Sequence, residues 1–256
     1  MKEDSPMSIN PFSLEGKTVL VTGASSGIGR ETAIRVSQMG GTVVVVGRNR
    51  GRLEDTFAAL EGTDRVHRQV VCDQTNEEDL ERLIDGIPQL DGVVQCAGTS
   101  VLFPFQFSTR EKYDRVFEVN FFSTVELLRL LYKKKKISNG GSVVLIASVG
   151  GTTVFDTGNG VYGASKAALV STMKFCAKEF AKKRIRVNAI APGRVHTPLI
   201  ESGTMTDEQI RMDEAKYPLG RYGEPADVAH GVIYLLSDAA AWVTGAMLVI
   251  DGGLSI

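Results

Sequence analysis

The sequence predicts a single α/β domain, in which a doubly wound sheet of about seven parallel strands carries helices on both faces. Short runs of β-branched and apolar residues alternate with helical patterns along the chain. That alternation is typical of a parallel sheet covered on both sides. Polar and glycine-rich motifs follow several predicted strands directly, at the edge where such sheets bind ligands. We find no linker and no internal repeat in the sequence.

The elements follow one another in order from near residue 17. Strands are expected near residues 17–22, 42–46, 66–71, 91–95, 142–147, 185–190 and 246–250. Helices are expected near residues 27–39, 50–60, 76–85, 110–135, 161–182 and 225–237. Residues 1–13 contain acids and prolines and are interpreted as a flexible N-terminal extension. Residues 14–256 are interpreted as the folded domain.

Composition excludes several classes of protein. A chain of 256 residues that is 43% hydrophobic can bury a full core. A formal net charge of −1 argues against a broad nucleic-acid interface. Cys72, Cys96 and Cys176 are widely separated, so neither a disulfide framework nor a metal site is expected. The sequence shows neither the apolar core of a signal peptide nor a stretch of ~18 apolar residues, so we expect no membrane association and a cytoplasmic location.

A glycine-rich segment, Thr-Gly-Ala-Ser-Ser-Gly-Ile-Gly over residues 22–29, lies between the first predicted strand and the first predicted helix. Glycines at these positions let the backbone turn tightly and approach a pyrophosphate, whose charge then lies at the N-terminus of the next helix. This strand and helix context favours a dinucleotide site over an ordinary glycine turn. Residues 14–256 are therefore interpreted as a dinucleotide-binding domain, and the residues considered next make it a candidate catalytic domain.

The second predicted strand ends in Gly47-Arg48-Asn49 rather than in an acid. A carboxylate there would accept hydrogen bonds from the ribose hydroxyls of NAD and repel the extra phosphate of NADP. Arg48 can instead bind that phosphate through charge-assisted hydrogen bonds. The sequence therefore favours NADP(H), while NAD(H) stays possible if Arg48 is merely solvated.

Tyr162 and Lys166 stand four residues apart at the start of an alanine-rich helical pattern. Residues at this spacing lie on one face of a helix, so an ammonium group can stabilise the ionised phenol. A cation ~4 Å away at an effective dielectric of ~20 contributes roughly 4 kcal/mol, enough to lower a pKa of ~10 by about three units at most. Tyr162 is therefore a candidate general acid.

The spacing alone is a weak signal, because Tyr132 and Lys136 share it. That pair lies where a charged helix end meets two glycines, and we interpret it as solvated surface. In contrast, Ser148 ends an apolar strand pattern fourteen residues before Tyr162. Ser148, Tyr162 and Lys166 are thus candidates for stabilising and protonating a carbonyl oxygen during hydride transfer.

From about residue 14 to the C-terminus, these motifs together resemble the short-chain dehydrogenase/reductase family. The resemblance implies a Rossmann-type fold, a nicotinamide cofactor and a catalytic group of Asn120, Ser148, Tyr162 and Lys166. It also implies a second role for Lys166 at the nicotinamide ribose, and a water held by Asn120. The cofactor-binding residues that it implies are Gly23, Ser25, Ser26, Gly27, Ile28, Gly29, Arg48, Asp73, Ala97, Gly98, Tyr162, Lys166, Pro192, Gly193, Val195 and Thr197.

Three departures from the family pattern bear on these assignments. Gln95-Cys96 replaces two asparagines that help to tie neighbouring strands together in the family, so the local hydrogen bonds are expected to differ. The interval from Ser148 to Tyr162 is one residue longer than usual, and the intervening loop is expected to absorb the extra residue. Ser26 stands where many NADP-preferring relatives have a basic residue, which leaves the phosphate to Arg48.

Two functional hypotheses follow. The first is an NADP(H)-dependent ketone reductase or alcohol dehydrogenase, with a 3-oxoacyl-(acyl-carrier-protein) reductase of fatty acid biosynthesis as the best subclass and sugar, polyol or other small-ketone dehydrogenases as alternatives. The second is an NADP-binding redox sensor without catalysis, against which the intact catalytic group argues.

Other segments are open to more than one interpretation. Residues 133–136 and Lys178 are either solvated cations at helix ends or a docking surface for an acidic carrier protein. His196 is a polar loop residue or a substrate contact. Residues 199–221 lack strong periodicity in their first half and are expected to form a mobile lid over the substrate. The family resemblance and an apolar C-terminus suggest a homotetramer.

Overall fold

Seven parallel strands form one sheet in the order β3-β2-β1-β4-β5-β6-β7. The computed structural model describes residues 10–62, 64–198 and 206–256. The strands are β1 (Thr18–Thr22), β2 (Thr42–Gly47), β3 (Arg68–Val71), β4 (Leu90–Gln95), β5 (Ile137–Ile146), β6 (Arg186–Pro192) and β7 (Met247–Ile250). Strand order reverses between β1 and β4, as expected for a doubly wound sheet. The predicted fold class is confirmed.

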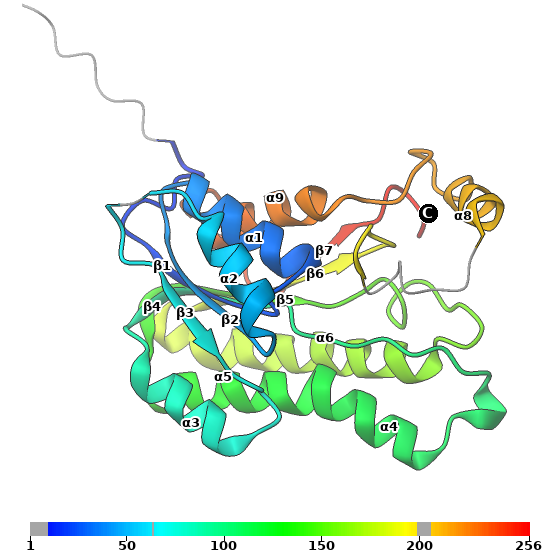
Figure 1. Cartoon of the computed structure of the whole chain (residues 1–256), viewed down its shortest axis with the longest axis horizontal. Helices are drawn as coiled ribbons and strands as arrows, with labels where there is room; N and C mark the ends of the chain where they lie inside the picture. Colours follow the sequence, from blue (N-terminus) through cyan, green and yellow to red (C-terminus); the bar gives the residue numbers. More distant parts are fainter. Residues whose placement is uncertain (1–9, 63, 199–205) are drawn as a thin grey trace, which may run out of the picture.

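Helices cover both faces of the sheet (Figure 1). They are α1 (Gly27–Gln38), α2 (Arg50–Ala58), α3 (Glu77–Gly86), α4 (Arg110–Phe117), α5 (Ser123–Lys133), α6 (Gly160–Phe180), α8 (Asp207–Glu214) and α9 (Pro225–Leu236). The layer of α1, α2 and α9 lies on one side, and α3, α4, α5 and α6 lie on the other. All neighbouring strands are parallel, so their carboxyl ends meet at one edge.

The hydrophobic core divides into two clusters because alternate strand residues point to opposite faces. Val19 and Val21 of β1 pack beneath α1 and α9. Leu20, between them, packs with α5 and α6 on the other face. All three side chains are fully buried. Both faces of the central strands are therefore apolar, which explains their continuous hydrophobic runs.

The helix predicted over residues 110–135 is interrupted. A π-helical turn, Glu118–Phe122, separates α4 from α5. Aromatic rings pack together there, with the Phe121 and Phe122 centroids 5.3 Å apart and those of Phe117 and Phe121 6.0 Å apart. Such turns insert a residue into a helix and are frequent at functional sites. Here the turn contains Asn120.

Strand β5 begins at Ile137, five residues before the predicted start at 142. Its pairing with β4 shifts between Leu90 and Gly92. Gly140, at φ +84°, lies within this irregular stretch. A bulge of this kind hides the start of a strand from a search for simple alternation.

Helix α8 lies in the segment, residues 199–221, that we predicted as a mobile lid. Thr206 caps it by accepting a hydrogen bond from the Gln209 backbone N–H, and the Gln209 side chain accepts from the Thr206 N–H in return. This capping box is a sequence signal for a helix start, and periodicity alone missed it. Residues 199–205, the first part of the predicted lid, lie outside the described residues.

Residues 10–14 contact the body of the domain. The Pro11 carbonyl accepts a hydrogen bond from the Ala239 backbone N–H. The ring of Phe12 lies 6.4 Å from that of Tyr234 on α9, and Leu14 is fully buried. Residues 1–9 of the predicted extension lie outside the described residues.

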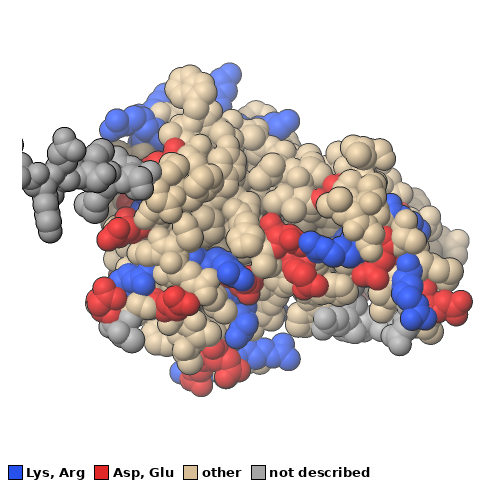
Figure 2. All heavy atoms as spheres, turned by 90° about the horizontal axis from the view of Figure 1, so that it is seen from above, with Lys and Arg blue, Asp and Glu red and all other residues tan. Residues whose placement is uncertain are grey.

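The surface carries charges of both signs. On the face that Figure 2 presents, acidic and basic side chains are interspersed rather than segregated. Among the described residues, no helix combines the length and the apolar character needed to cross a membrane.

Candidate active site

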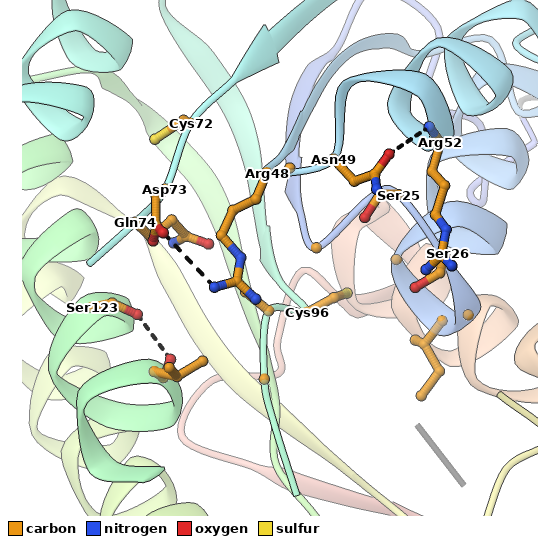
Figure 3. Close-up of a pocket in the computed structure, with 18 of the residues that line it drawn as sticks. Ser25, Ser26, Arg48, Asn49, Arg52, Cys72, Asp73, Gln74, Cys96 and Ser123 are labelled. Atoms are coloured by element: carbon orange, nitrogen blue, oxygen red, sulfur yellow. Dashed lines mark hydrogen bonds and ion pairs between the residues drawn. The ribbon is translucent and has the colours of Figure 1, made fainter. Parts of the chain in front are cut away.

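A cavity of about 650 Å³ opens at the carboxyl ends of β1, β2, β3 and β4 (Figure 3). Its position is the one predicted from the motifs that follow these strands. The lining residues are Gly23, Ser25, Ser26, Gly27, Ile28, Gly29, Gly47, Arg48, Asn49, Arg52, Cys72, Asp73, Gln74, Thr75, Cys96, Ala97, Gly98, Val119, Ser123, Thr197 and Pro198.

The glycine-rich turn forms one wall of this cavity, and its three glycines leave no room for a side chain. A Cβ on Gly23 would lie 2.8 Å from the Ala97 nitrogen, and one on Gly29 would overlap the Gly23 carbonyl. Gly27 has φ +52°, and a Cβ there would lie 2.9 Å from Thr197. The Ser26 side chain makes no capping hydrogen bond to α1. The first-turn N–H groups of α1 thus stay available to an anion, and the turn fits a pyrophosphate.

Two guanidinium groups line the cavity beyond β2. Arg48 extends across it, and its Nη1 lies 3.8 Å from Asp73 Oδ2 (Figure 3). Arg52, in the first turn of α2, lines the same cavity. Asn49 caps this helix by accepting a hydrogen bond from the Arg52 backbone N–H. The sequence analysis identified Arg48 and missed Arg52. Asn49 is a typical helix cap, and a cation three residues after such a cap is the sequence signal that could have identified Arg52.

Asp73 follows β3 and faces Arg48. Its carboxylate accepts hydrogen bonds from the backbone N–H and the hydroxyl of Thr75. Partial burial alone would raise the pKa of Asp73, but the Thr75 hydrogen bonds and the charge of Arg48 together lower it. Asp73 is therefore a charged acceptor at the cavity wall, a chemistry that suits the amino group of a nucleobase.

Gln95 ties together the strands beneath the cavity. Its Oε1 accepts hydrogen bonds from Thr22 Oγ1 at 3.0 Å and from Gln74 Nε2 at 3.3 Å. The Thr22 hydroxyl in turn accepts from the backbone N–H groups of Cys96 and Ala97. These contacts join β1, β4 and the segment after β3. The difference from the family's hydrogen bonds stays a prediction.

Cys96 lines the cavity, but its thiol is a poor nucleophile. Burial raises its pKa to about 12, although the charge of Lys166 and a hydrogen bond with Thr32 lower it in part. A thiol with this pKa stays protonated at neutral pH. Cys96 thus serves as a small packing residue.

Ser148, Tyr162 and Lys166 come together beside the cavity. Ser148 follows β5 directly, and Tyr162 and Lys166 lie one turn apart on α6. The Tyr162 hydroxyl forms a hydrogen bond with Ser148, and Lys166 Nζ lies 5.8 Å from the centre of the Tyr162 ring. The cavity reaches this group through Gly98, where a Cβ would lie 3.4 Å from Lys166 Nζ.

The pKa values at this group differ from those predicted. Burial raises the pKa of Tyr162, and the Ser148 hydrogen bond offsets only part of that rise. The Lys166 ammonium donates one hydrogen bond to the Ile146 carbonyl at 2.8 Å. Burial lowers the pKa of Lys166 to about 8. The predicted lowering of the Tyr162 pKa by Lys166 therefore does not describe this structure, where burial is the largest influence on the phenol and raises its pKa.

Asn120 is fully buried in the π-helical turn. Its Nδ2 donates hydrogen bonds to the Thr99 carbonyl at 2.9 Å and to Ser165 Oγ at 3.0 Å. Its Oδ1 accepts from the Thr99 backbone N–H at 2.7 Å. The side chain thus holds the segment after β4 against α6, next to Lys166. The predicted water at Asn120 stays a prediction.

The loop after β6 brings Thr197 to the cavity. Thr197 and Pro198 line it, and Thr197 lies against Gly27. Val195 points away, because its side chain is buried in the core. Gly193 packs against Tyr217 and Asp251. Pro192, Gly193 and Val195 are not among the described residues that line the cavity. Of the four residues predicted in this loop, Thr197 is the one that the structure places at the cavity.

The loop between Ser148 and α6 absorbs its extra residue in a tight turn. The Val149 carbonyl accepts hydrogen bonds from the backbone N–H groups of residues 152, 153 and 154. Gly151, at φ +88°, packs on the backbone of Gly163, where a Cβ would overlap the Gly163 carbonyl. Ser148 therefore keeps its hydrogen bond with Tyr162 despite the longer interval.

The second Tyr–Lys pair lies elsewhere and is not solvated as we predicted. The Tyr132 ring stacks on Phe180 with centroids 3.9 Å apart, and Lys136 Nζ donates to the Ile87 carbonyl. Both residues lie near the start of β5, at the opposite edge of the sheet from the cavity. They connect α5 to α6 and to the segment before β4.

The chain matches known proteins over nearly its whole length. A family model described as enoyl-(acyl carrier protein) reductase matches residues 23–255. A tropinone reductase homolog of Arabidopsis thaliana is 33% identical over 251 residues, which make up 96% of this chain and 92% of that protein. 3-Oxoacyl-(acyl-carrier-protein) reductase FabG of Thermotoga maritima is 32% identical over 247 residues, which make up 95% of this chain and 99% of that protein.

Solved structures agree with the architecture. A short-chain type dehydrogenase/reductase from Mycobacterium marinum matches with a TM-score of 0.86 and 30% identity, covering 96% of this chain and 98% of that one. An aldohexose dehydrogenase from Thermoplasma acidophilum matches with a TM-score of 0.81 and 28% identity, covering 94% and 95%.

Proposed function

Because this chain belongs to the short-chain dehydrogenase/reductase family, we propose that it catalyses hydride transfer between NADP(H) and a carbonyl or secondary alcohol. The observation that carries the proposal is the junction at Gly98. There a cavity with a glycine-rich pyrophosphate cradle meets a group of Ser148, Tyr162 and Lys166. A protein that only senses a nucleotide needs the cavity but not this group.

Ser148, Tyr162 and Lys166 have separate roles in the proposed proton transfer. The nicotinamide, when bound, supplies or accepts the hydride. In the direction of reduction, the Tyr162 hydroxyl donates its proton to the substrate oxygen as negative charge develops there. The Ser148 hydroxyl donates a second hydrogen bond to the same oxygen. Lys166, with a pKa of about 8, is largely an ammonium at neutral pH and stabilises the phenolate that Tyr162 leaves behind.

The preference for NADP(H) follows from the charges beyond β2. Arg48 and Arg52 both line the cavity, and the segment between them contributes no carboxylate. Among the described residues, no acid forms an ion pair with Arg52, whereas Arg48 contacts Asp73 at the edge of ion-pair range. Two cations in one wall attract a ribose 2′-phosphate. Arg52 thus compensates for Ser26, which lacks the charge that many relatives carry at that position.

Replacing Arg48 or Arg52 with alanine is expected to weaken NADPH binding by about 10- to 100-fold, since each charge-assisted hydrogen bond contributes about 1.5–3 kcal/mol. NADH lacks the phosphate, so its dissociation constant should change by less than about threefold. The measurement is a fluorescence titration with each nucleotide. Arg50→Ala, an exposed neighbour that does not line the cavity, is the control. Equal losses for NADPH and NADH would contradict a phosphate site here.

The substrate class is a narrower proposal, and we place a 3-oxoacyl thioester first because of the FabG relatives. The basic residues that suggested a carrier protein do not support it. Lys178 lies sixteen residues after Tyr162 on α6, roughly 24 Å along the helix axis. Residues 133–136 lie between the end of α5 and the start of β5. A carrier bound at either place would have to deliver its acyl group across the whole sheet.

A substrate panel tests both levels of the proposal. NADPH oxidation is followed with an acetoacetyl thioester, a bicyclic amino ketone and an aldohexose, with NADP⁺ and secondary alcohols for the reverse direction. Saturable turnover of the thioester supports the narrower proposal. Turnover of another ketone alone would remove the thioester but retain the oxidoreductase. NADPH binding without turnover of any member of a broad panel would favour the redox sensor.

A further inference from the structure

A cluster of charged and aromatic side chains lies outside the cavity, at the C-terminal end of α8. We call it the Asp213 cluster, and its centre is a carboxylate that is only 12% exposed. Asp213 accepts hydrogen bonds from the Tyr222 hydroxyl at 2.6 Å and from Lys216 Nζ at 2.7 Å. It also forms an ion pair with Arg194 Nε at 3.2 Å. Its members are Arg194, His196, Asp213, Glu214, Lys216, Tyr217 and Tyr222.

The neighbouring acid, Glu214, contacts the same two segments. One of its carboxylate oxygens accepts from the Tyr222 backbone N–H at 3.4 Å and lies 3.6 Å from His196 Nε2. The His196 and Tyr222 rings pack with centroids 5.4 Å apart. The end of α8 thus contacts the loop after β6 and the segment before α9 together.

The cluster fixes the backbone of the loop that carries Thr197. The Tyr217 hydroxyl accepts a hydrogen bond from the Arg194 backbone N–H at 3.1 Å. The Tyr217 ring is buried and packs edge-on against Tyr222, with centroids 5.5 Å apart. The Arg194 carbonyl accepts from the Gly223 N–H, and the Gly223 carbonyl accepts from the His196 N–H, both at 2.9 Å.

The other end of this short loop lines the cavity. Thr197 is the next residue after His196, and it packs on Gly27 of the glycine-rich turn. Asp213, Glu214, Tyr217 and Tyr222 are not among the described residues that line the cavity. Their contacts therefore act on the cavity only through the backbone between residues 194 and 197.

We propose that Asp213 is a positioning residue for the cofactor, which holds the loop of Thr197 in place through Arg194 and Tyr222. This inference rests on the proposed NADP(H) site. A carboxylate with three donors and little exposure is difficult to replace, because removing it leaves the partly buried Tyr222 hydroxyl without its acceptor. The loop then samples other conformations, and the apparent dissociation constant rises in proportion to the population that is lost.

The test is a fluorescence titration of NADPH with Asp213→Ala and Tyr222→Phe. If the loop keeps its place about one tenth of the time, Asp213→Ala weakens NADPH binding about tenfold. Tyr222→Phe keeps the ring and loses one donor, so a smaller loss of about threefold is expected. The kcat at saturating NADPH should change by less than about threefold in both variants, because neither residue touches the reacting groups. Glu208→Gln, an exposed acid on the same helix, is the control and should bind NADPH like the parent protein.

The double variant Asp213→Ala/Tyr222→Phe should bind NADPH no more weakly than Asp213→Ala alone, since Tyr222 is proposed to act through Asp213. A purely structural role would lower the melting temperature of Asp213→Ala and leave the NADPH dissociation constant within about twofold of the parent value, and this result would overturn the inference. Failure of the parent protein to bind either nucleotide would instead overturn the proposed function, so the two failures are distinguishable.

Discussion

Replacing Tyr162 with phenylalanine is expected to lower kcat for ketone reduction about 100-fold or more. The change removes the hydroxyl that donates the proton and keeps the ring in its place at the start of α6. Ser148 and Lys166 remain, but neither can deliver a proton from the same position. The measurement is steady-state NADPH oxidation with whichever ketone of the panel is turned over.

The matched control for this variant is Tyr132→Phe. Tyr132 also stands four residues before a lysine, yet its ring stacks on Phe180 at the other edge of the sheet. Its kcat should match that of the parent protein. NADPH titrations with both variants should give dissociation constants near the parent value, which separates a chemical effect from a loss of binding. Equal kcat values for Tyr162→Phe and Tyr132→Phe would contradict the role of Tyr162.

Replacing Lys166 with methionine is expected to abolish activity and to remove a pH-dependent contribution to the stability of the fold. The folded chain releases the Lys166 proton near pH 8, whereas the unfolded chain keeps it up to about pH 10.5. The unfolded state therefore binds more protons between these values, and the contribution of Lys166 makes stability rise with pH in that window. Below pH 8 the buried ammonium opposes folding by at most about 3 kcal/mol. Loss of its hydrogen bond to Ile146 costs about 1–3 kcal/mol in return.

The pH profile is a sharper test than the absolute stability. The free energy of unfolding is measured with urea at pH 7, 8, 9 and 10. In the parent protein it should include an increase with pH from Lys166, and Lys166→Met should lack this increase. The control is Lys178→Met on the exposed side of the same helix, whose profile should follow the parent protein. Parallel profiles for the parent and Lys166→Met would show that the buried ammonium is not a destabilising group.

The alternation of strands and helices along the chain and the positions of the motifs were predictable, because both depend on local patterns. The residues that line the cavity mostly follow strand ends, and parallel strands bring those ends to one edge whatever the details of packing. The glycine turn and the Ser148, Tyr162 and Lys166 group are in the predicted places for this reason. Residues 199–205 of the predicted lid cannot be compared with the structure.

Features that depend on distant partners were not predictable in this way. The side chain of Asn120 forms hydrogen bonds with Thr99 and Ser165, which are 21 and 45 positions away in the sequence. The π-helical turn that contains Asn120 leaves no periodic pattern in the sequence. The pKa of Tyr162 depends on burial, which the sequence around it does not report. Helix α8 is short and mostly exposed, so its apolar pattern is weak, although its capping box was readable.

The central claim is that a nicotinamide bound in the cavity faces the Tyr162 hydroxyl. A crystal structure of the protein with NADP⁺ tests this most directly. We expect the pyrophosphate at residues 23–29, the 2′-phosphate at Arg48 and Arg52, and C4 of the nicotinamide on the side of Ser148 and Tyr162, with room for one carbonyl group between them. A nicotinamide ring bound away from the Tyr162 hydroxyl, or a nucleotide bound outside this cavity, would contradict the account.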